Sequence, residues 1–263
     1  MDLLNIKKQV CQLAKEVGQF QVNELKNFDR SKIIAKGFND PVSYVDQESE
    51  RMLVEGLKSV LPDAGFLTEE ETLVTDTSGI HWVIDPLDGT NNFVHQVPFF
   101  GISIALCDGH DILLGVVHEP NTNQCFSATK NGGAFLNDEP IKVSGNTELS
   151  KALVATGFPY SLLDKEEKYF DIIRYIINNS HGIRRLGAAS LDLCYVACGR
   201  FDAYFEFNLK PWDVTAGALI VKEAGGVISK FDSQNNDVYD GKEIVATCGF
   251  QQELTDLINQ HWG

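Results

Sequence analysis

The sequence lacks any long apolar run and has little positive charge. No stretch of about twenty apolar residues occurs, the length that a membrane-spanning helix needs. Its 263 residues include 22 lysines and arginines against 37 aspartates and glutamates, a formal net charge of −15. Such an acidic surface disfavours nonspecific binding to nucleic acid or to an anionic membrane. We therefore expect neither as a partner.

Motifs for nucleophilic and zinc-dependent catalysis are also missing. The six histidines form no H-E-x-x-H spacing, and no G-x-S-x-G elbow or G-x-x-x-x-G-K nucleotide loop occurs. Among six cysteines, Cys194 and Cys198 are spaced to share a helix face, but without two more soft ligands they are expected in the core rather than on zinc. No signal-peptide pattern is present, so we expect reduced thiols and a cytoplasmic location.

The most informative segment is WVIDPLDGTNNF, residues 82–93. Residues 80–84 are mostly apolar and alternate between two faces, which predicts a largely buried strand. Pro86 has no N–H for a strand ladder and disfavours helix in the residue before it, so pairing should end at Asp85. Asp85 is therefore predicted at the tip of a buried strand.

The residues after Asp85 predict a turn and then a short helix. Asp88 lies in the turn, and Gly89 permits backbone angles that other residues resist. Thr90 is expected to cap a helix that begins at Asn91. Amides at a helix start favour a bound anion, whereas the carboxylates of Asp85 and Asp88 repel one. The arrangement therefore needs cations between the carboxylates and the anion, and Mg²⁺ prefers such oxygen ligands. An ordinary pair of Asp-Pro and Asp-Gly turns is the alternative.

Two further acids occur where strands or helices end. Glu69 follows the strand-like residues 66–68 and reaches Asp85 if the two strands are neighbours, although acidic runs are usually solvated loops. Asp213 opens a helical pattern over residues 214–224, where it is equally suited to cap the helix.

The segments DPLDGTNNF and PWDVTAGALIVKEAGG resemble the two signatures of the inositol monophosphatase family, which are lithium-sensitive, Mg²⁺-dependent phosphatases. The resemblance covers nearly the whole chain. It extends to Asp46 in SYVDQESE, to the pair Glu69 and Glu70, to HGIRRLGAASLDLCYVACGRFDAYFE and to the C-terminal helix.

The resemblance implies a site with two or three Mg²⁺ ions. One ion would be held by Glu69, Asp85 and the carbonyl of Leu87, and a second by Asp85, Asp88 and Asp213. A third, weaker ion would lie near Glu69, with Asp46 supporting it and Thr90 nearby. The implied catalytic residues are Glu69, Thr90 and Asp46, and the implied substrate contacts are Asp88, Gly89, Thr90, Gly187, Ala188, Ala189, Glu206 and Asp213.

The implied reaction is hydrolysis of a phosphate monoester by water, without a phosphoenzyme. Glu69 and Thr90 would orient the water, and the amides of Gly89 and Thr90 would hold phosphate oxygens. Two or three magnesium ions would also reverse the local field of an acidic protein.

The substrate side departs from the family pattern. Ala188 stands where many relatives have Thr or Ser, Thr68 stands where Gly is frequent, and Glu71 adds a negative charge. Glu206 would accept hydrogen bonds from polyol hydroxyls, or would instead be an exposed carboxylate of an alternating strand. Residues 187–189 could equally form a close-packed helix start.

The coarse pattern predicts two halves. Helices are expected near the N-terminus and after Asp46, followed by an antiparallel meander with strands at 101–107, 112–118, 124–128 and 134–136. Beyond residue 145, strands at 152–156, 183–186, 203–207, 227–229 and 244–247 alternate with helices. We expect residues 1–145 to carry most metal ligands and residues 146–263 to complete the site. The resemblance implies a mixed α+β and α/β fold, a five-layer αβαβα sandwich of the sugar-phosphatase type, and a homodimer.

We therefore expect a Mg²⁺-dependent phosphomonoesterase that acts on inositol monophosphates or related small phosphorylated metabolites. The alternatives on the same scaffold are fructose-1,6-bisphosphatase, 3′-phosphoadenosine-5′-phosphate phosphatase and NADP phosphatase. A regulatory binding protein that keeps the fold is the alternative from a different class.

Overall fold

A computed structural model describes residues 1–28, 34–37, 40–70, 73, 75–158, 165–232 and 235–262. Glu71 lies outside these residues. The helices are α1 (Leu3–Lys26), α2 (Tyr44–Val60), α3 (Thr90–Val94), α4 (Glu166–Asn179), α5 (Ala189–Ala197), α6 (Pro211–Glu223) and α7 (Gln251–Trp262). The strands are β1 (Ile34–Gly37), β2 (Asp40–Val42), β3 (Gly65–Thr68), β4 (Ile80–Asp88), β5 (Gly101–Asp108), β6 (Asp111–Glu119), β7 (Gln124–Thr129), β8 (Ala134–Leu136), β9 (Glu139–Pro140), β10 (Leu153–Thr156), β11 (Gly182–Arg184), β12 (Ala203–Phe207), β13 (Val227–Ser229) and β14 (Glu243–Thr247).

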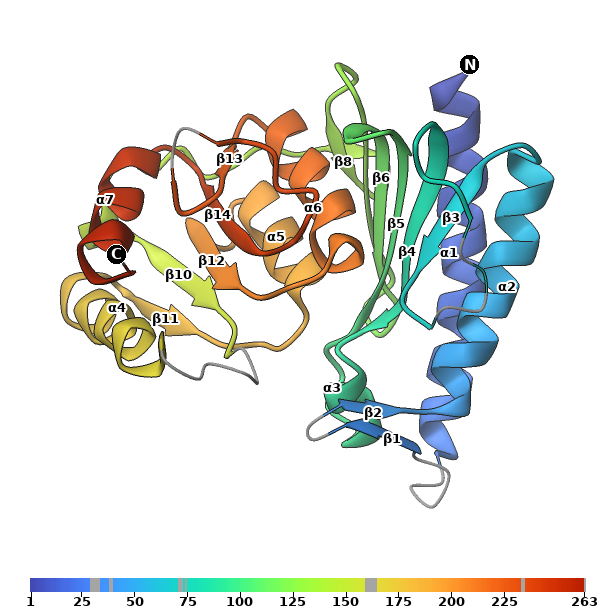
Figure 1. The fold of residues 1–263 in the computed structure, drawn as a ribbon, viewed down its shortest axis with the longest axis horizontal. Coiled ribbons are helices and arrows are strands. Elements are labelled where there is room, and N and C mark those ends of the chain that lie inside the picture. Colours follow the sequence, from blue (N-terminus) through green and yellow to red (C-terminus); the bar gives the residue numbers. More distant parts are fainter. Residues whose placement is uncertain are drawn as a thin grey trace.

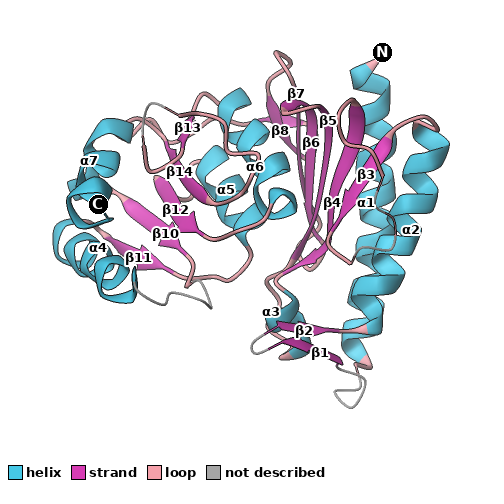
Figure 2. Cartoon of the chain, viewed as in Figure 1, coloured by secondary structure: helices cyan, strands magenta, loops and turns pink. Residues whose placement is uncertain are grey.

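Helices and sheets alternate in five layers (Figure 1). Helices α1 and α2 cover the outer face of a seven-stranded sheet, whose inner face packs against α5 and α6. A five-stranded sheet follows, and α4 and α7 cover its far side, as the colours in Figure 2 make plain. The expected αβαβα sandwich is therefore confirmed. No helix in the described part of the chain has both the length and the apolar character to cross a bilayer.

The larger sheet has the order β3-β4-β5-β6-β7-β8-β9 and is antiparallel except for the parallel pair β3 and β4. Successive side chains of β4 point to opposite faces, as a strand requires. Trp82 and Ile84 lie in the core against α1 and α2, whereas Val83 lies in the core against α5 and α6. Both faces of this sheet are covered, which explains why its strands are apolar at nearly every position.

The smaller sheet has the order β11-β10-β12-β14-β13. Strands β10, β11 and β12 are parallel, and β14 joins antiparallel to β12 and β13. Aromatic side chains fill the core between this sheet and α4 and α7, with Trp262 in contact with Tyr169, Phe207 and Phe231. The expected strands of the C-terminal half are confirmed, except that β11 ends at Arg184 rather than Leu186.

The expectation that pairing ends at Asp85 is wrong. Asp85 pairs with Ser103, the register then shifts, and Asp88 pairs with Gly101. This register shift leaves Pro86 out of the hydrogen-bonded ladder, in which it has no N–H to donate. Strand pairing then resumes at Asp88. Strand β4 therefore delivers both aspartates rather than one.

The close contact between α6 and β6 depends on a residue without a side chain. A Cβ at Gly115 would lie 2.6 Å from the carbonyl oxygen of Ala216, which belongs to the backbone of α6 and cannot easily move. We therefore expect Gly115→Ala to lower the free energy of unfolding by about 1–3 kcal/mol, as overpacked cores do. Urea denaturation measures this, with Gly79→Ala as the control because nothing lies within 4 Å of a Cβ there. Equal stabilities of the two variants would contradict the tight packing.

Candidate active site

The segment that links β4 to α3 lies at one end of the larger sheet. The amide of Leu87 donates to Asp85 Oδ1 at 2.9 Å, which fixes that carboxylate beside its own backbone. Gly89 has φ +91° and caps α3, and a Cβ there would lie 3.2 Å from the carbonyl oxygens of Gly187 and Phe99. Both the left-handed angle and the close approach require glycine at this position.

Thr90 does not cap α3, contrary to expectation, but is its first residue. Its Oγ1 lies 3.0 Å from both Asp46 Oδ1 and the carbonyl oxygen of Leu87. Asp46 is itself held at the start of α2, where it accepts hydrogen bonds from the amide and hydroxyl of Ser43 at 2.8 and 2.6 Å. The Thr90 hydroxyl therefore joins α2 to the end of β4.

Glu69 lies beside Asp85 because β3 and β4 are parallel neighbours. Thr68 pairs with Ile84, and the amide of Glu69 extends the ladder by donating to the Ile84 carbonyl at 3.2 Å. The carboxyl groups of Glu69 and Asp85 are hydrogen-bonded to each other. The expected meeting of the two strands is thus confirmed, and Glu69 is half-buried in the turn after β3.

Asp88 and Asp213 connect this end of the sheet to the inner helices. Asp88 accepts hydrogen bonds from the amides of Ala189 and Ser190, at 3.2 and 2.7 Å, and from the Ser190 hydroxyl at 2.5 Å. Asp213, in the first turn of α6, accepts from the amide of Lys210 at 2.7 Å, which confirms its capping role. Each carboxylate therefore lies at the N-terminus of a helix, where negative charge is favoured.

Glu69, Asp85, Asp88 and Asp213, here termed the acidic cluster, oppose one another electrostatically. Burial raises the pKa of Asp85 well above its usual range, and the charges of the other three raise it further. Burial also raises the pKa of Glu69 well above its usual range, and burial with the charge of Asp88 raises the pKa of Asp213 to about 8. Buried like charges of this kind are relieved by a proton or by a cation.

The side-chain donor atoms of the acidic cluster are all oxygens. The carbonyl oxygen of Leu87, which accepts a hydrogen bond from the Thr90 hydroxyl, is a further oxygen donor beside them. Hard divalent ions such as Mg²⁺ take this donor set. Among the described residues no three Asp, Glu, His or Cys side chains already surround one ion position, and Glu69 and Asp85 bond to each other instead. The chemistry of the donors and their shared charge fit a divalent metal.

Residues 187–189 lie opposite Gly89. Gly187 has φ +91°, Ala188 is buried, and Ala189 is the first residue of α5, so the segment is a helix start that also borders the acidic cluster. The side-chain amide of Asn92 donates to the carbonyls of Phe99 and Leu186 at 2.7 and 2.9 Å. Asn92 and Ser190 hold these segments together, and the sequence pattern singled out neither of them.

Glu206 is buried, so its reading as an exposed carboxylate is wrong. Glu206 is 9% exposed to solvent and accepts a hydrogen bond from Tyr204 Oη at 2.5 Å. Burial raises its pKa to about 7, although the Tyr204 bond and the charge of Arg185 lower it. A Cβ at Gly157 would collide with the carboxylate, which shows how closely β12 and the end of β10 approach here.

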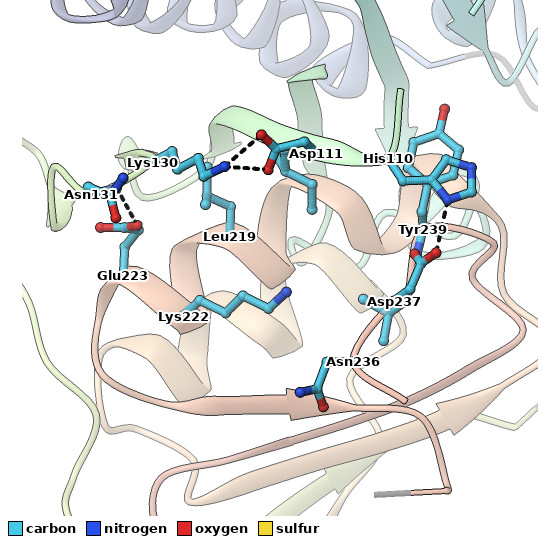
Figure 3. A pocket seen from close by; sticks show the side chains of 12 residues that line it. His110, Asp111, Lys130, Asn131, Leu219, Lys222, Glu223, Asn236, Asp237 and Tyr239 are labelled. Carbon is cyan, nitrogen blue, oxygen red and sulfur yellow. Dashed lines mark hydrogen bonds and ion pairs between the residues drawn. The ribbon is translucent and has the colours of Figure 1, made fainter. Parts of the chain in front are cut away.

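A separate cavity of about 530 Å³ lies at the opposite end of α6, around Lys222 (Figure 3). Its acidic side chains already have partners. Asp111 pairs with Lys130 at 2.6 Å, Asp237 pairs with His110 at 2.9 Å, and Glu223 accepts from the amides of Asn131 and Gly133. This cavity therefore lacks the opposed carboxylates that distinguish the acidic cluster.

The five layers and the buried carboxylates between two helix starts define the class of metal-dependent phosphomonoesterases. The chain belongs to the inositol monophosphatase family, whose profile matches residues 2–262. The resemblance seen in the two signature segments is therefore confirmed over the whole molecule.

Relatives with two different names share this family. The chain is 41% identical over 256 residues to a protein of Neisseria meningitidis serogroup B named putative Nus factor SuhB, covering 94% of this chain and 95% of that one. It is 40% identical over 259 residues to the inositol-1-monophosphatase of Rhizobium meliloti, covering 98% and 96%.

Solved structures agree with the fold. The inositol monophosphatase from Anabaena has a TM-score of 0.88 at 32% identity, with 99% of this chain and 98% of that one covered. An IMPase/NADP phosphatase complexed with NADP and Ca²⁺ has a TM-score of 0.85 at 22% identity, a likeness of fold alone.

The acidic cluster generates a prediction for the metal-free protein. Asp213 has a pKa raised from 3.8 to about 8 in the folded state, so the folded chain keeps a proton that the unfolded chain releases. The protonated Asp213 contributes its full stabilisation below the unfolded-state pKa of 3.8. This stabilisation is lost as the pH rises to the folded-state pKa of about 8. With a chelator present, we therefore expect the melting temperature to fall across this pH window.

Thermal unfolding at several pH values measures this loss. Asp213→Asn cannot titrate, so its melting temperature should depend less on pH than that of the unmodified chain. A melting temperature that rises through this window in the chelated protein would contradict the assignment.

Proposed function

We propose that the protein is a Mg²⁺-dependent phosphate monoester hydrolase that acts on inositol monophosphates. The observation that carries the proposal is the acidic cluster, in which two buried carboxylates from β4 and two half-buried ones from the end of β3 and from α6 oppose one another beside the start of α3. Family membership supports the reaction class, and the inositol-1-monophosphatase of Rhizobium meliloti supports the substrate.

The ligands proposed for two or three Mg²⁺ ions are Glu69, Asp85, Asp88, Asp213 and the carbonyl oxygen of Leu87. Bound metal would supply Lewis-acid activation of water and neutralise charge on the phosphate. Asp85 would serve two ions, and the charges of Glu69, Asp88 and Asp213 that all act on it support this role. Asp46 would support a third position through Thr90, to which it is hydrogen-bonded.

The chain's own catalytic groups are proposed to be Glu69, Thr90 and Asp46. The Thr90 hydroxyl can donate a single hydrogen bond, and Asp46 Oδ1 lies 3.0 Å away to accept it. Such a pair leaves the lone pairs of Thr90 Oγ1 to accept a hydrogen bond from a water, which would then be aimed at phosphorus. Glu69 would take the water's proton, since burial favours its protonated form.

The phosphate and the alcohol are proposed to lie between α3 and the start of α5. The amides of Gly89 and Thr90 would hold phosphate oxygens, with Asp88 and Asp213 near the ester oxygen. Gly187, Ala188 and Ala189 would border the substrate, and Glu206 would accept a hydrogen bond from a polyol hydroxyl. Ala188 offers only a methyl group, so hydroxyl recognition falls mainly on Glu206.

We place the boundary between the two halves near residue 145. The larger sheet is built from residues 65–140, and the smaller sheet from residues 153–247, which supports this division. We also propose a homodimer in the cytoplasm, where the six free cysteines would remain reduced.

The inositol phosphate assignment is tested with a panel of phosphate esters. We expect the highest kcat/KM for inositol monophosphate, with lower values for fructose-1,6-bisphosphate, NADP and 3′-phosphoadenosine-5′-phosphate. A preference for one of the other compounds would replace the substrate but keep the reaction. Absence of phosphate release from every compound with Mg²⁺ present would overturn the enzyme assignment.

A second candidate function is regulatory binding, and its support is the 41% identity to a relative named putative Nus factor SuhB. The two functions are separable, because a hydrolysis-deficient variant that keeps its surface would retain the binding role. Copurification of transcription components with the unmodified chain and with Asp88→Asn distinguishes them.

Asp88→Asn should lower kcat by several orders of magnitude while the fold persists. The change removes a charge from the proposed metal site, but the asparagine oxygen can still accept from the Ser190 amide. Steady-state phosphate release measures the loss, and circular dichroism verifies the fold. Asp63→Asn, at an exposed turn residue, is the matched control and should keep normal turnover. Near-normal kcat in Asp88→Asn would mean that the ligand assignment is wrong.

Lithium ions should inhibit the reaction, as the family signatures imply. Inhibition would show as phosphate release that falls with LiCl and not with NaCl at equal ionic strength. An activity that LiCl leaves unchanged would assign the chain to a lithium-tolerant branch of the family.

A further inference from the structure

Cys11 and Cys125 meet in the core between α1 and the larger sheet. Cys11 lies in α1 and Cys125 in β7, and the two elements are packed against each other. Cys125 is 3% exposed, whereas Cys11 is half-buried and packs against the cluster that contains Cys125. Cys11 packs against the same core cluster as Cys125, and the two thiols are near enough for each to shift the pKa of the other.

The charges around Cys11 favour its thiolate. The hydrogen bond from Cys125 lowers the pKa of Cys11 below its usual value, and one from Ser127 and the charges of Lys7 and Lys15 act in the same direction against burial. Lys7 and Lys15 lie four residues before and after Cys11, on the same face of α1. The same hydrogen bond, together with burial, raises the pKa of Cys125. These two directions favour a thiolate at Cys11 over a thiolate at Cys125.

The other four cysteines lack this combination. Burial raises the pKa of each of them, to about 12 for Cys107. Cys194 in α5 and Cys198 at the C-cap of that helix would be the alternative pair, but burial raises the pKa of both thiols. Reactivity toward oxidants follows thiolate character and access, so these thiols provide internal controls.

We propose that Cys11 is a site of reversible oxidation by peroxides and that Cys125 is the resolving thiol, so that oxidation closes a disulfide between α1 and β7. This site is independent of the acidic cluster and of the proposed hydrolysis.

The chemistry balances with peroxide as the oxidant. The Cys11 thiolate attacks one peroxide oxygen, the O–O bond breaks, and hydroxide leaves with a sulfenic acid formed at Cys11. Cys125 then attacks the Cys11 sulfur, the S–O bond breaks, and the oxygen leaves as water with the proton of Cys125. In sum, two thiols and one hydrogen peroxide give one disulfide and two waters, and a dithiol reductant reverses the bond.

The disulfide would tie the first helix to a central part of the larger sheet. It would join positions 11 and 125, so the unfolded chain would lose the freedom of the long segment between them. The oxidised protein should therefore unfold at a higher temperature than the reduced protein.

Peroxide treatment of the metal-loaded protein tests the proposal. Peptide mapping under non-reducing conditions should show one crosslinked pair that contains Cys11 and Cys125, with Cys194 and Cys198 still free thiols. The melting temperature should rise with oxidation and return on treatment with dithiothreitol. Absence of the Cys11 to Cys125 crosslink, or formation of a different one first, would overturn the proposal.

Three variants locate the chemistry. Cys125→Ser should abolish the crosslink and let dimedone trap a sulfenic acid at Cys11, whereas Cys11→Ser should abolish both products. Cys198→Ser, the matched control at a half-buried thiol, should keep the crosslink. A Cys125→Ser protein that yields no dimedone adduct at Cys11 would exclude Cys11 as the first thiol to react.

Discussion

Repulsion among carboxylates buried side by side is the constraint on which the rest of the structure depends. Glu69 and Asp85 share a hydrogen bond, and the charges of Asp88 and Asp213 raise the pKa of Asp85 further. The chain holds these groups in place with backbone donors, from Leu87 to Asp85 and from Ser190 to Asp88. An ordinary core would have separated such groups or replaced them, because buried charge without a partner is costly. Their retention makes sense when cations complete the site.

The layered fold serves this constraint by bringing two helix starts to one end of the larger sheet. Helices α5 and α6 begin beside the end of β4, and the Ser103 hydroxyl ties β5 to the carbonyl of Trp212 at 2.9 Å. Gly115 lets α6 approach β6 within backbone contact at Ala216, three residues after Asp213, so this packing helps to set the position of the acid. Positions fixed by strands and packed helices are more precise than positions on loops, and metal ligation needs that precision.

Local patterns in the sequence were enough to find Asp85 and Asp213, since one lies near the end of an apolar strand and the other opens a helical pattern that Gly225 and Gly226 end. The change from a meander to alternating strands and helices indicates the two halves, whereas the five layers were implied by the resemblance to the inositol monophosphatase family. Ser190 and Asn92 could not be found this way: their partners Asp88 and Leu186 lie 102 and 94 residues away. Pairing beyond Pro86 was missed for a related reason, because the compensating shift depends on the neighbouring strand.

The two sides of the site are built by different physical means, and this bears on how one fold serves several substrates. Asp85 and Asp88 lie in strand β4, Glu69 follows strand β3, and backbone amides hold Asp85 and Asp88, so the positions of these acids are set by the sheet and the helix starts. Ala188 and Glu206 are instead the contacts that we propose for the alcohol, and both are buried. Exchange of a methyl for a hydroxyl there changes one hydrogen bond without moving a metal ligand. Under the proposed assignments, the substrate-facing side of the site can therefore change between relatives while the metal-binding side stays the same.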